Sequence, residues 1–97
     1  MATRGDTVSD LQSIASGAYL DIRPSSSEEW VIHNIYHDDM VELSFYDGTN
    51  EIVFDADTSF GAWTWYEFHL TYTRRIRVKN TASAARLVGY DGMCTKP

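Results

Sequence analysis

Polar and apolar residues alternate along most of this chain, and the alternation constrains its fold more than any other feature. A period of two is the spacing of a β-strand with one face buried and the other exposed. Turn-forming residues interrupt the alternation about every 8–14 residues, which is typical of all-β domains. The strands predicted in this way cover residues 18–22, 28–37, 40–46, 50–55, 60–73, 74–80 and 84–90.

Seven such runs in a chain of 97 residues predict one all-β domain, a β-sandwich or a small barrel. We expect a sandwich of about seven to eight antiparallel strands over residues 16–97. Asp47 and Gly48 form a strong hairpin signal, because both residue types tolerate a positive φ. Residues 1–15 differ, since Val8, Leu11 and Ile14 have helical spacing, and they are predicted as an N-terminal arm or one helical turn.

Composition excludes several classes of protein. The net charge of −6 disfavours binding to nucleic acid, so no nucleic-acid partner is expected. No apolar run approaches the roughly 20 residues that a membrane-spanning helix needs, so no membrane contact is expected either. The single cysteine, Cys94, excludes an internal disulfide and a cysteine-rich zinc site. These features favour synthesis in a reducing cytoplasm.

Charge is distributed unevenly between the two parts of the sequence. Residues 1–57 contain twelve acids and two bases, whereas residues 58–97 contain six bases and two acids. One explanation is that the two parts interleave in one sheet and neutralise each other within the monomer. The other is that acidic and basic faces of neighbouring copies meet, because complementary charge fixes the register of an interface. The sequence leaves both open.

No group of residues predicts an enzyme, a metal site or a cofactor site. His33 and His37 lie four apart, but in a strand that spacing separates them by about 13 Å. Asp55 and Asp57 resemble the start of a calcium loop, yet the glycine and glutamate that an EF-hand requires later in the loop are missing. We therefore expect no catalytic residues, no metal and no cofactor.

Two sets of residues are candidates for an interface. Trp63 and Trp65 share a strand face with polar residues if the alternation extends back to residue 63, and both indoles then point away from the core. Core packing is the alternative for these tryptophans. Arg75, Arg77 and Lys79 alternate with apolar residues, so a strand displays all three bases on one face, about 6–7 Å apart.

The pattern of residues 14–24 and 28–35 resembles small virion proteins of tailed bacteriophages of about this length. The shared pattern is an extended strand that ends in Pro24, a short loop and a second strand that contains Trp30. Residues 75–80 and 87–92 also resemble that group, so the resemblance covers roughly residues 14–92.

This resemblance implies a β-sandwich or jelly-roll protein of the phage particle. Many such proteins are head decoration ("cement") proteins, which bind where capsomers meet, frequently as trimers. We therefore expect a non-enzymatic capsid decoration protein on the virion surface, whose partners are the major capsid protein and further copies of itself. The alternative is a tail-associated glycan- or receptor-binding module that uses Trp63, Trp65 and Tyr66 as a stacking surface.

Overall fold

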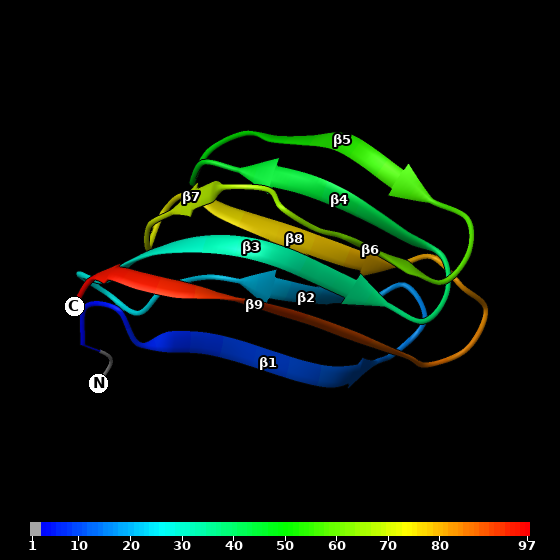
Figure 1. The fold of residues 1–97 in the computed structure, drawn as a ribbon. Coiled ribbons are helices and arrows are strands. Elements are labelled where there is room, and N and C mark those ends of the chain that lie inside the picture. Colours follow the sequence, from blue (N-terminus) through cyan, green and yellow to red (C-terminus); the bar gives the residue numbers. More distant parts are fainter. Residues whose placement is uncertain (1–2) are drawn as a thin grey trace.

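The computed structural model describes residues 3–97 and consists of two antiparallel β-sheets packed face to face (Figure 1). This confirms the prediction of a small all-β sandwich. The described part contains no helix, and hence none that crosses a membrane. The nine strands are β1 (Thr7–Ile14), β2 (Tyr19–Ile22), β3 (Glu29–His37), β4 (Val41–Tyr46), β5 (Glu51–Asp57), β6 (Gly61–Trp63), β7 (Phe68–Leu70), β8 (Arg75–Asn80) and β9 (Arg86–Lys96).

The strand order is that of a jelly roll. The five-stranded sheet has the order β1-β9-β3-β6, with β7 also paired to β3, and the four-stranded sheet has the order β2-β8-β4-β5. Consecutive strands pass from one sheet to the other, except at the β4–β5 hairpin and between β6 and β7. Strands β6 and β7 occupy two stretches of the same edge of β3, so nine strands fill the eight positions of a jelly roll.

The core lies between the two sheets and is formed by the inward-facing residues of the alternating strands. On β8, Ile76 and Val78 are buried, and the three bases Arg75, Arg77 and Lys79 lie on the outer face, as predicted. The largest fully buried aliphatic residues are Ile22, Ile32, Ile35, Leu43, Leu70, Ile76, Val41, Val78 and Val88.

One buried polar residue connects the two sheets. The Asn80 amide donates to the backbone carbonyls of Ile14, at 2.8 Å, and Ala84, at 2.9 Å. Its side-chain oxygen accepts from the backbone N–H of Ala82, at 2.9 Å. Asn80 therefore satisfies backbone groups at the end of β1 and in the loop before β9, where no sheet partner is available.

The prediction for the N-terminal residues is wrong in the described part of the arm. Residues 7–14 form neither a helical turn nor a separate arm but strand β1, which pairs with β9 over eight consecutive residues. Val8 and Ile14 face the core, whereas Leu11 faces solvent and is 63% exposed. The apolar spacing that suggests a helix therefore combines residues from two faces of a strand. Residues 1–2 of the predicted arm lie outside the described residues.

Two other strand boundaries differ from the prediction. Residues 60–73 form the two short strands β6 and β7 instead of one long strand, with an irregular connection between them. Strand β9 continues through Asp91 and Gly92 to Lys96, beyond the predicted end at residue 90. The predicted hairpin after β4 is confirmed, because Gly48 has a φ of +102° and the Asp47 N–H donates to the Asn50 carbonyl at 3.2 Å.

Candidate groove beneath Trp65

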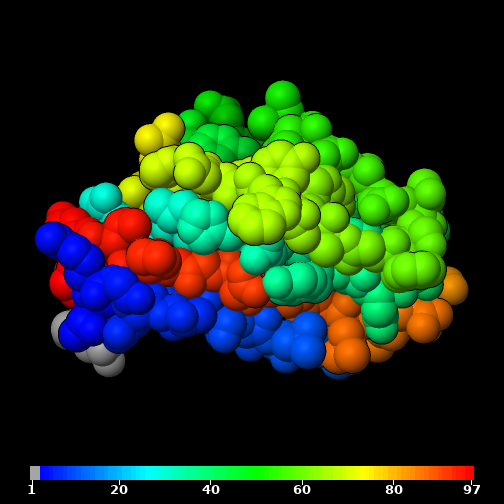
Figure 2. Space-filling view, viewed as in Figure 1, coloured from blue at the N-terminus to red at the C-terminus, as the bar shows by residue number. Residues whose placement is uncertain are grey.

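Trp65 is the most exposed large apolar residue of the described chain. Its side chain is 94% exposed, and its backbone has a φ of +66°, in the left-handed region that non-glycine residues rarely occupy. It lies in the connection between β6 and β7, which stands out from the face formed by β3, β9 and β1 (Figure 2). Strained residues of this kind persist only where the surrounding structure holds them, and they are concentrated at functional sites.

Strand β3 holds this connection through its backbone and side chains. The Tyr66 N–H donates to the His33 carbonyl at 3.2 Å, and the Tyr66 carbonyl accepts from His33 Nδ1 at 3.0 Å. The Trp65 N–H donates to Asn34 Oδ1 at 3.3 Å. Because a carbonyl only accepts, Nδ1 carries the proton, and Nε2 of the neutral ring remains an acceptor.

Asp91 on β9 organises the floor of the same face. Its two carboxylate oxygens accept from Asn34 Nδ2 and from the Tyr36 hydroxyl, both at 2.7 Å. The hydrogen bond to this carboxylate raises the pKa of Tyr36 above its ordinary value of 10.0, with smaller effects from burial and from the negative charge. The phenol therefore remains a donor, and Asn34 is fixed between Asp91 and the Trp65 backbone.

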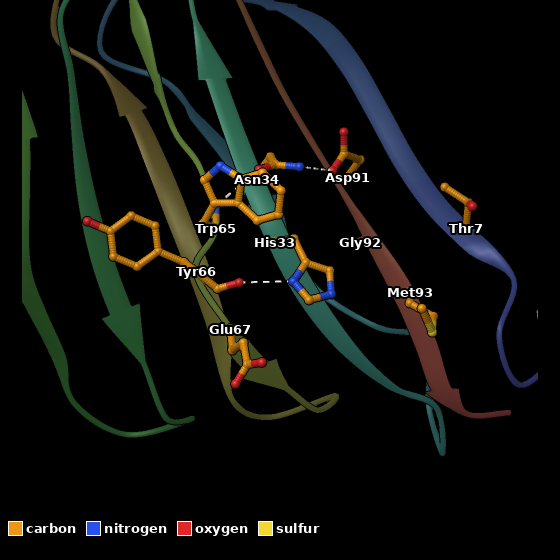
Figure 3. Close-up of a pocket in the computed structure, with 9 residues that line it drawn as sticks. All are labelled: Thr7, His33, Asn34, Trp65, Tyr66, Glu67, Asp91, Gly92 and Met93. Atoms are coloured by element: carbon orange, nitrogen blue, oxygen red, sulfur yellow. Dashed lines mark hydrogen bonds between the residues drawn. The ribbon is translucent and has the colours of Figure 1, made fainter.

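A groove of about 510 Å³ lies between this network and the Trp65 indole. Its volume is within the range of roughly 300–1,000 Å³ found for small-molecule sites. Figure 3 shows the indole lying over Asn34, with the His33 ring beside it. The groove is lined by Thr7, His33, Asn34, Trp65, Tyr66, Glu67, Asp91, Gly92 and Met93.

The chemistry of the lining favours a polar ligand and disfavours an anionic one. Its formal charges are the carboxylates of Asp91 and Glu67, and no lysine or arginine is among the lining residues. Residues 3–97 bring together no three histidine, cysteine, aspartate or glutamate side chains that could hold a metal ion. The groove therefore offers one aromatic surface, several hydrogen-bonding groups and a negative potential.

The three aromatic residues predicted as a stacking surface point in different directions. Trp63 packs partly against the core, where its ring lies 4.9 Å from His37 and its Nε1 donates to Asp55 at 2.8 Å. The side chain of Tyr66 points away from the groove and stacks on Phe68, with the ring centroids 5.3 Å apart (Figure 3). Of the three, only Trp65 presents its ring to the groove. The expectation that Trp63 and Trp65 share one exposed strand face is therefore wrong.

The predicted basic row lies on the outer face of the four-stranded sheet, on the other side of the sandwich. Arg77 forms ion pairs with Asp21, at 2.9 Å, and with Glu51, at 3.1 Å. Arg75 lies over the Tyr46 ring at 4.5 Å, and neither Arg75 nor Lys79 forms an ion pair within residues 3–97. The row is thus one neutralised arginine flanked by two bases that have no such partner.

The ion pairs answer part of the question raised by the uneven charge. The three bases Arg77, Arg86 and Lys96 each pair with an acid from residues 1–57. The two parts of the sequence therefore interleave in the sheets, and the charges of these three bases are neutralised within the monomer.

The other candidate residues lie apart from the groove or are engaged elsewhere. His37 is buried, 3.4 Å from the Asp57 carboxylate, whereas His33 faces the groove. Asp55 accepts from Trp63 Nε1, and within residues 3–97 Asp55 and Asp57 belong to no group of three or more potential metal ligands. Cys94 is a fully buried thiol in the core face of β9.

Sequence reasoning missed the residues that form the floor of the groove. Asn34 follows the apolar run Trp30–Ile32 and precedes Ile35, and a polar residue at this place in a strand was the available signal. Asp91 lies just beyond the predicted end of the last strand, although it pairs with β3 and β1 at the centre of a sheet.

Jelly rolls occur in viral capsid proteins and in lectins, so this fold by itself does not assign a function. Comparison of the sequence with protein-family models and with curated protein sequences gives no match.

Proposed function

We propose that this protein is a non-enzymatic virion structural protein, a phage capsid decoration protein that binds between capsomers through the outer face of its four-stranded sheet. The partners are the major capsid protein and further copies of the chain, with a trimer as the favoured assembly. The observation that carries the proposal is the arginine- and tyrosine-rich character of this face, combined with an uncovered edge strand.

Arginine and tyrosine are prominent among the residues that dominate binding energy in protein interfaces. On this face Arg77 lies over the Tyr19 ring at 3.9 Å, and Arg75 lies over the Tyr46 ring. Stacking orders these long side chains before a partner arrives, which lowers the entropic cost of association. Arg75 and Lys79 still lack an acidic partner in the described chain, so they are available to carboxylates of a capsid protein.

Strand β5 adds a second surface beside the basic row. It is the edge of the four-stranded sheet, and its apolar residues are exposed: Ile52 is 65% and Val53 is 54% accessible. An exposed apolar edge with free backbone groups is a template for another strand unless a partner covers it. Contact with a neighbouring copy or with a capsid subunit removes this edge from water.

A decoration protein stabilises the shell because its site exists only where assembled subunits meet. The proposal therefore predicts many copies on the head and greater thermal stability of decorated heads. A tail-associated module predicts few copies and no effect on head stability. Labelling the protein and imaging the virions distinguishes these two locations.

The interface is tested by reversing the charges of Arg75 and Lys79, which form no ion pair within residues 3–97, and the control removes only the exposed Lys96–Glu29 pair. Arg75→Glu with Lys79→Glu should leave the protein folded and sharply reduce its binding to heads that lack it. Arg4→Glu with Lys96→Glu is the matched control, because it changes the net charge equally and lies away from this face. Equal loss of binding in both double variants, or none in either, would contradict this interface.

Salt provides an independent measurement of the same interface. Raising the salt concentration from about 0.05 to 0.5 M shortens the screening length roughly threefold and should weaken the wild-type association. Binding that salt leaves unchanged would instead indicate contact through the apolar β5 edge.

A further inference from the structure

We propose that the groove beneath Trp65 is a binding site for a neutral sugar ring, which stacks on the indole and hydrogen-bonds to Asn34, Asp91 and His33. This site goes beyond capsid decoration, because it lies on the five-stranded sheet and needs no capsid protein. Three features of the groove support this site: the position of the indole, the free hydrogen-bonding capacity around it, and the charge of the groove.

The indole is held away from the core by a backbone conformation that packing of Trp65 does not explain. At 94% exposure, the side chain contributes little buried area to the fold. Three hydrogen bonds with His33 and Asn34 nevertheless fix residues 65 and 66, and Trp65 keeps a φ of +66°. The backbone that carries the indole is therefore fixed beside the groove before a ligand arrives, which lowers the entropic cost of stacking a ring on it.

The polar residues of the groove retain hydrogen-bonding capacity after their internal contacts are made. Asn34 gives one amide hydrogen to Asp91 and keeps the second. Each Asp91 oxygen accepts one hydrogen bond and has a further lone pair. The Nε2 atom of neutral His33 is an acceptor. Sugar hydroxyls both donate and accept, so adjacent hydroxyls match this mixture of one donor and several acceptors.

The charge and shape of the groove select among possible ligands. Asp91 and Glu67 disfavour sialic acids, phosphates and other anions, and no basic residue lines the groove to offset them. Quaternary ammonium ligands are bound by cages of several aromatic rings. Here Trp65 alone presents its ring, because the Tyr66 side chain points away (Figure 3). A neutral ring with an apolar face and hydroxyls at its edge satisfies both conditions.

The site is tested by titrating the ¹⁵N-labelled protein with methyl glycosides of galactose, glucose and mannose and with N-acetylglucosamine. We expect at least one of these to saturate with a Kd on the order of 1 mM, shifting the Trp65 indole N–H and the amides of Asn34 and Asp91. N-acetylneuraminic acid and choline are the anionic and cationic probes, and neither should saturate.

Two variants assign the binding to the indole. Trp65→Gly removes the ring while fitting the left-handed backbone, so it should remain folded by circular dichroism and lose binding by about tenfold or more. Phe60→Ala, at an aromatic that is 77% exposed and outside the groove, should bind as the wild type does.

Failure to saturate with any of the neutral sugars overturns the proposal. Binding that survives in Trp65→Gly also overturns it, as does stronger binding of N-acetylneuraminic acid or choline. None of these results bears on the capsid interface, whose charge-reversal variants lie on the other sheet.

Discussion

The outer faces of the two sheets of this sandwich are built in different ways. On the four-stranded sheet, burial alternates along β2 and β8, and Arg77 on β8 is neutralised by Asp21 on the adjacent strand β2 and by Glu51 on the edge strand β5. On the five-stranded sheet, the pairing of β3 with β9 is irregular beside Asn34, and an irregular connection is held above the strands by β3. The first face is determined by local sequence, whereas the second requires β1, β3, β9 and the β6–β7 connection to come together.

This difference indicates where a specific ligand site is expected. Regular strands display side chains at fixed intervals, which suits a broad contact surface with another protein. An irregular connection on a rigid sheet places a few groups at positions that alternation does not provide, as is common for binding sites. Four predictions probe the two faces separately.

The largest loss of stability is expected from a substitution at Gly92, where the backbone of β9 lies very close to that of β3. A β-carbon there would collide with the Val31 carbonyl and lie 2.7 Å from Ile32 Cα, so backbone must move. Gly92→Ala should therefore lower the free energy of unfolding by about 3 kcal/mol in urea denaturation. At Gly48, by contrast, a β-carbon finds only ordinary contacts, and Gly48→Ala should cost about 1 kcal/mol for the positive φ alone. Equal costs would contradict the close approach.

The two tryptophans of residues 63–65 should differ in their contribution to stability. Trp63→Ala removes core contacts and the hydrogen bond to Asp55, and should cost about 2–3 kcal/mol. Trp65→Gly should change the free energy of unfolding by less than about 0.5 kcal/mol, because relief of the left-handed strain offsets the greater freedom of glycine when unfolded. Chemical denaturation of both variants measures this. A large loss in Trp65→Gly would mean that the indole has a structural role.

These tryptophans also show how far the sequence predicts the site. Strict alternation places Trp63 and Trp65 on one exposed face, but residues 64–67 leave the sheet, and the two rings diverge. The left-handed conformation at Trp65 comes from contacts with His33 and Asn34, more than thirty residues away. Contacts between segments so distant in sequence leave no local pattern.

The four-stranded sheet was predicted more accurately because its pattern is local. The outward row on β8 and the turn at Gly48 follow from alternation and from glycine chemistry, and both are present. Strand β1 was missed because its exposed Leu11 completes an apparent helical spacing with Val8 and Ile14.

A smaller loss of stability is expected from substitutions in the basic row of β8. Burial alone lowers the pKa of Arg77, but its hydrogen bond to Asp21 and the charges of Asp21 and Glu51 outweigh burial and raise it. Arg77→Met should therefore cost about 1 kcal/mol, since it leaves two carboxylates unpaired, and Arg75→Met should cost less than about 0.5 kcal/mol. Urea denaturation at low and high salt measures both. The reverse order would mean that Arg75 is the residue required by the fold.

The smallest change in stability is expected from a substitution at Asp47, in the turn between β4 and β5 of the four-stranded sheet. The N–H groups of Asn50 and Thr49 donate to its carboxylate and lower its pKa below the ordinary value of 3.8. A lowered pKa means that this stabilisation is present above pH 3.8 and is lost as the pH falls through the folded-state value. Asp47→Asn keeps the acceptor oxygen, so its stability at pH 7 should be nearly unchanged. Titration of the Asp47 carboxyl by NMR should give a midpoint below 3.8, and a midpoint above that value contradicts these hydrogen bonds.

The central claim, that the two outer faces serve different partners, is tested most directly by a cryo-EM reconstruction of phage heads to which this protein is bound, as its proposed role requires. We predict that the outer face of the four-stranded sheet, with Arg75 and Lys79, lies against capsid subunits, and that Trp65 faces solvent on the outside of the head. A reconstruction in which Trp65 and Asp91 are buried against the capsid, with the basic row exposed, would contradict this account.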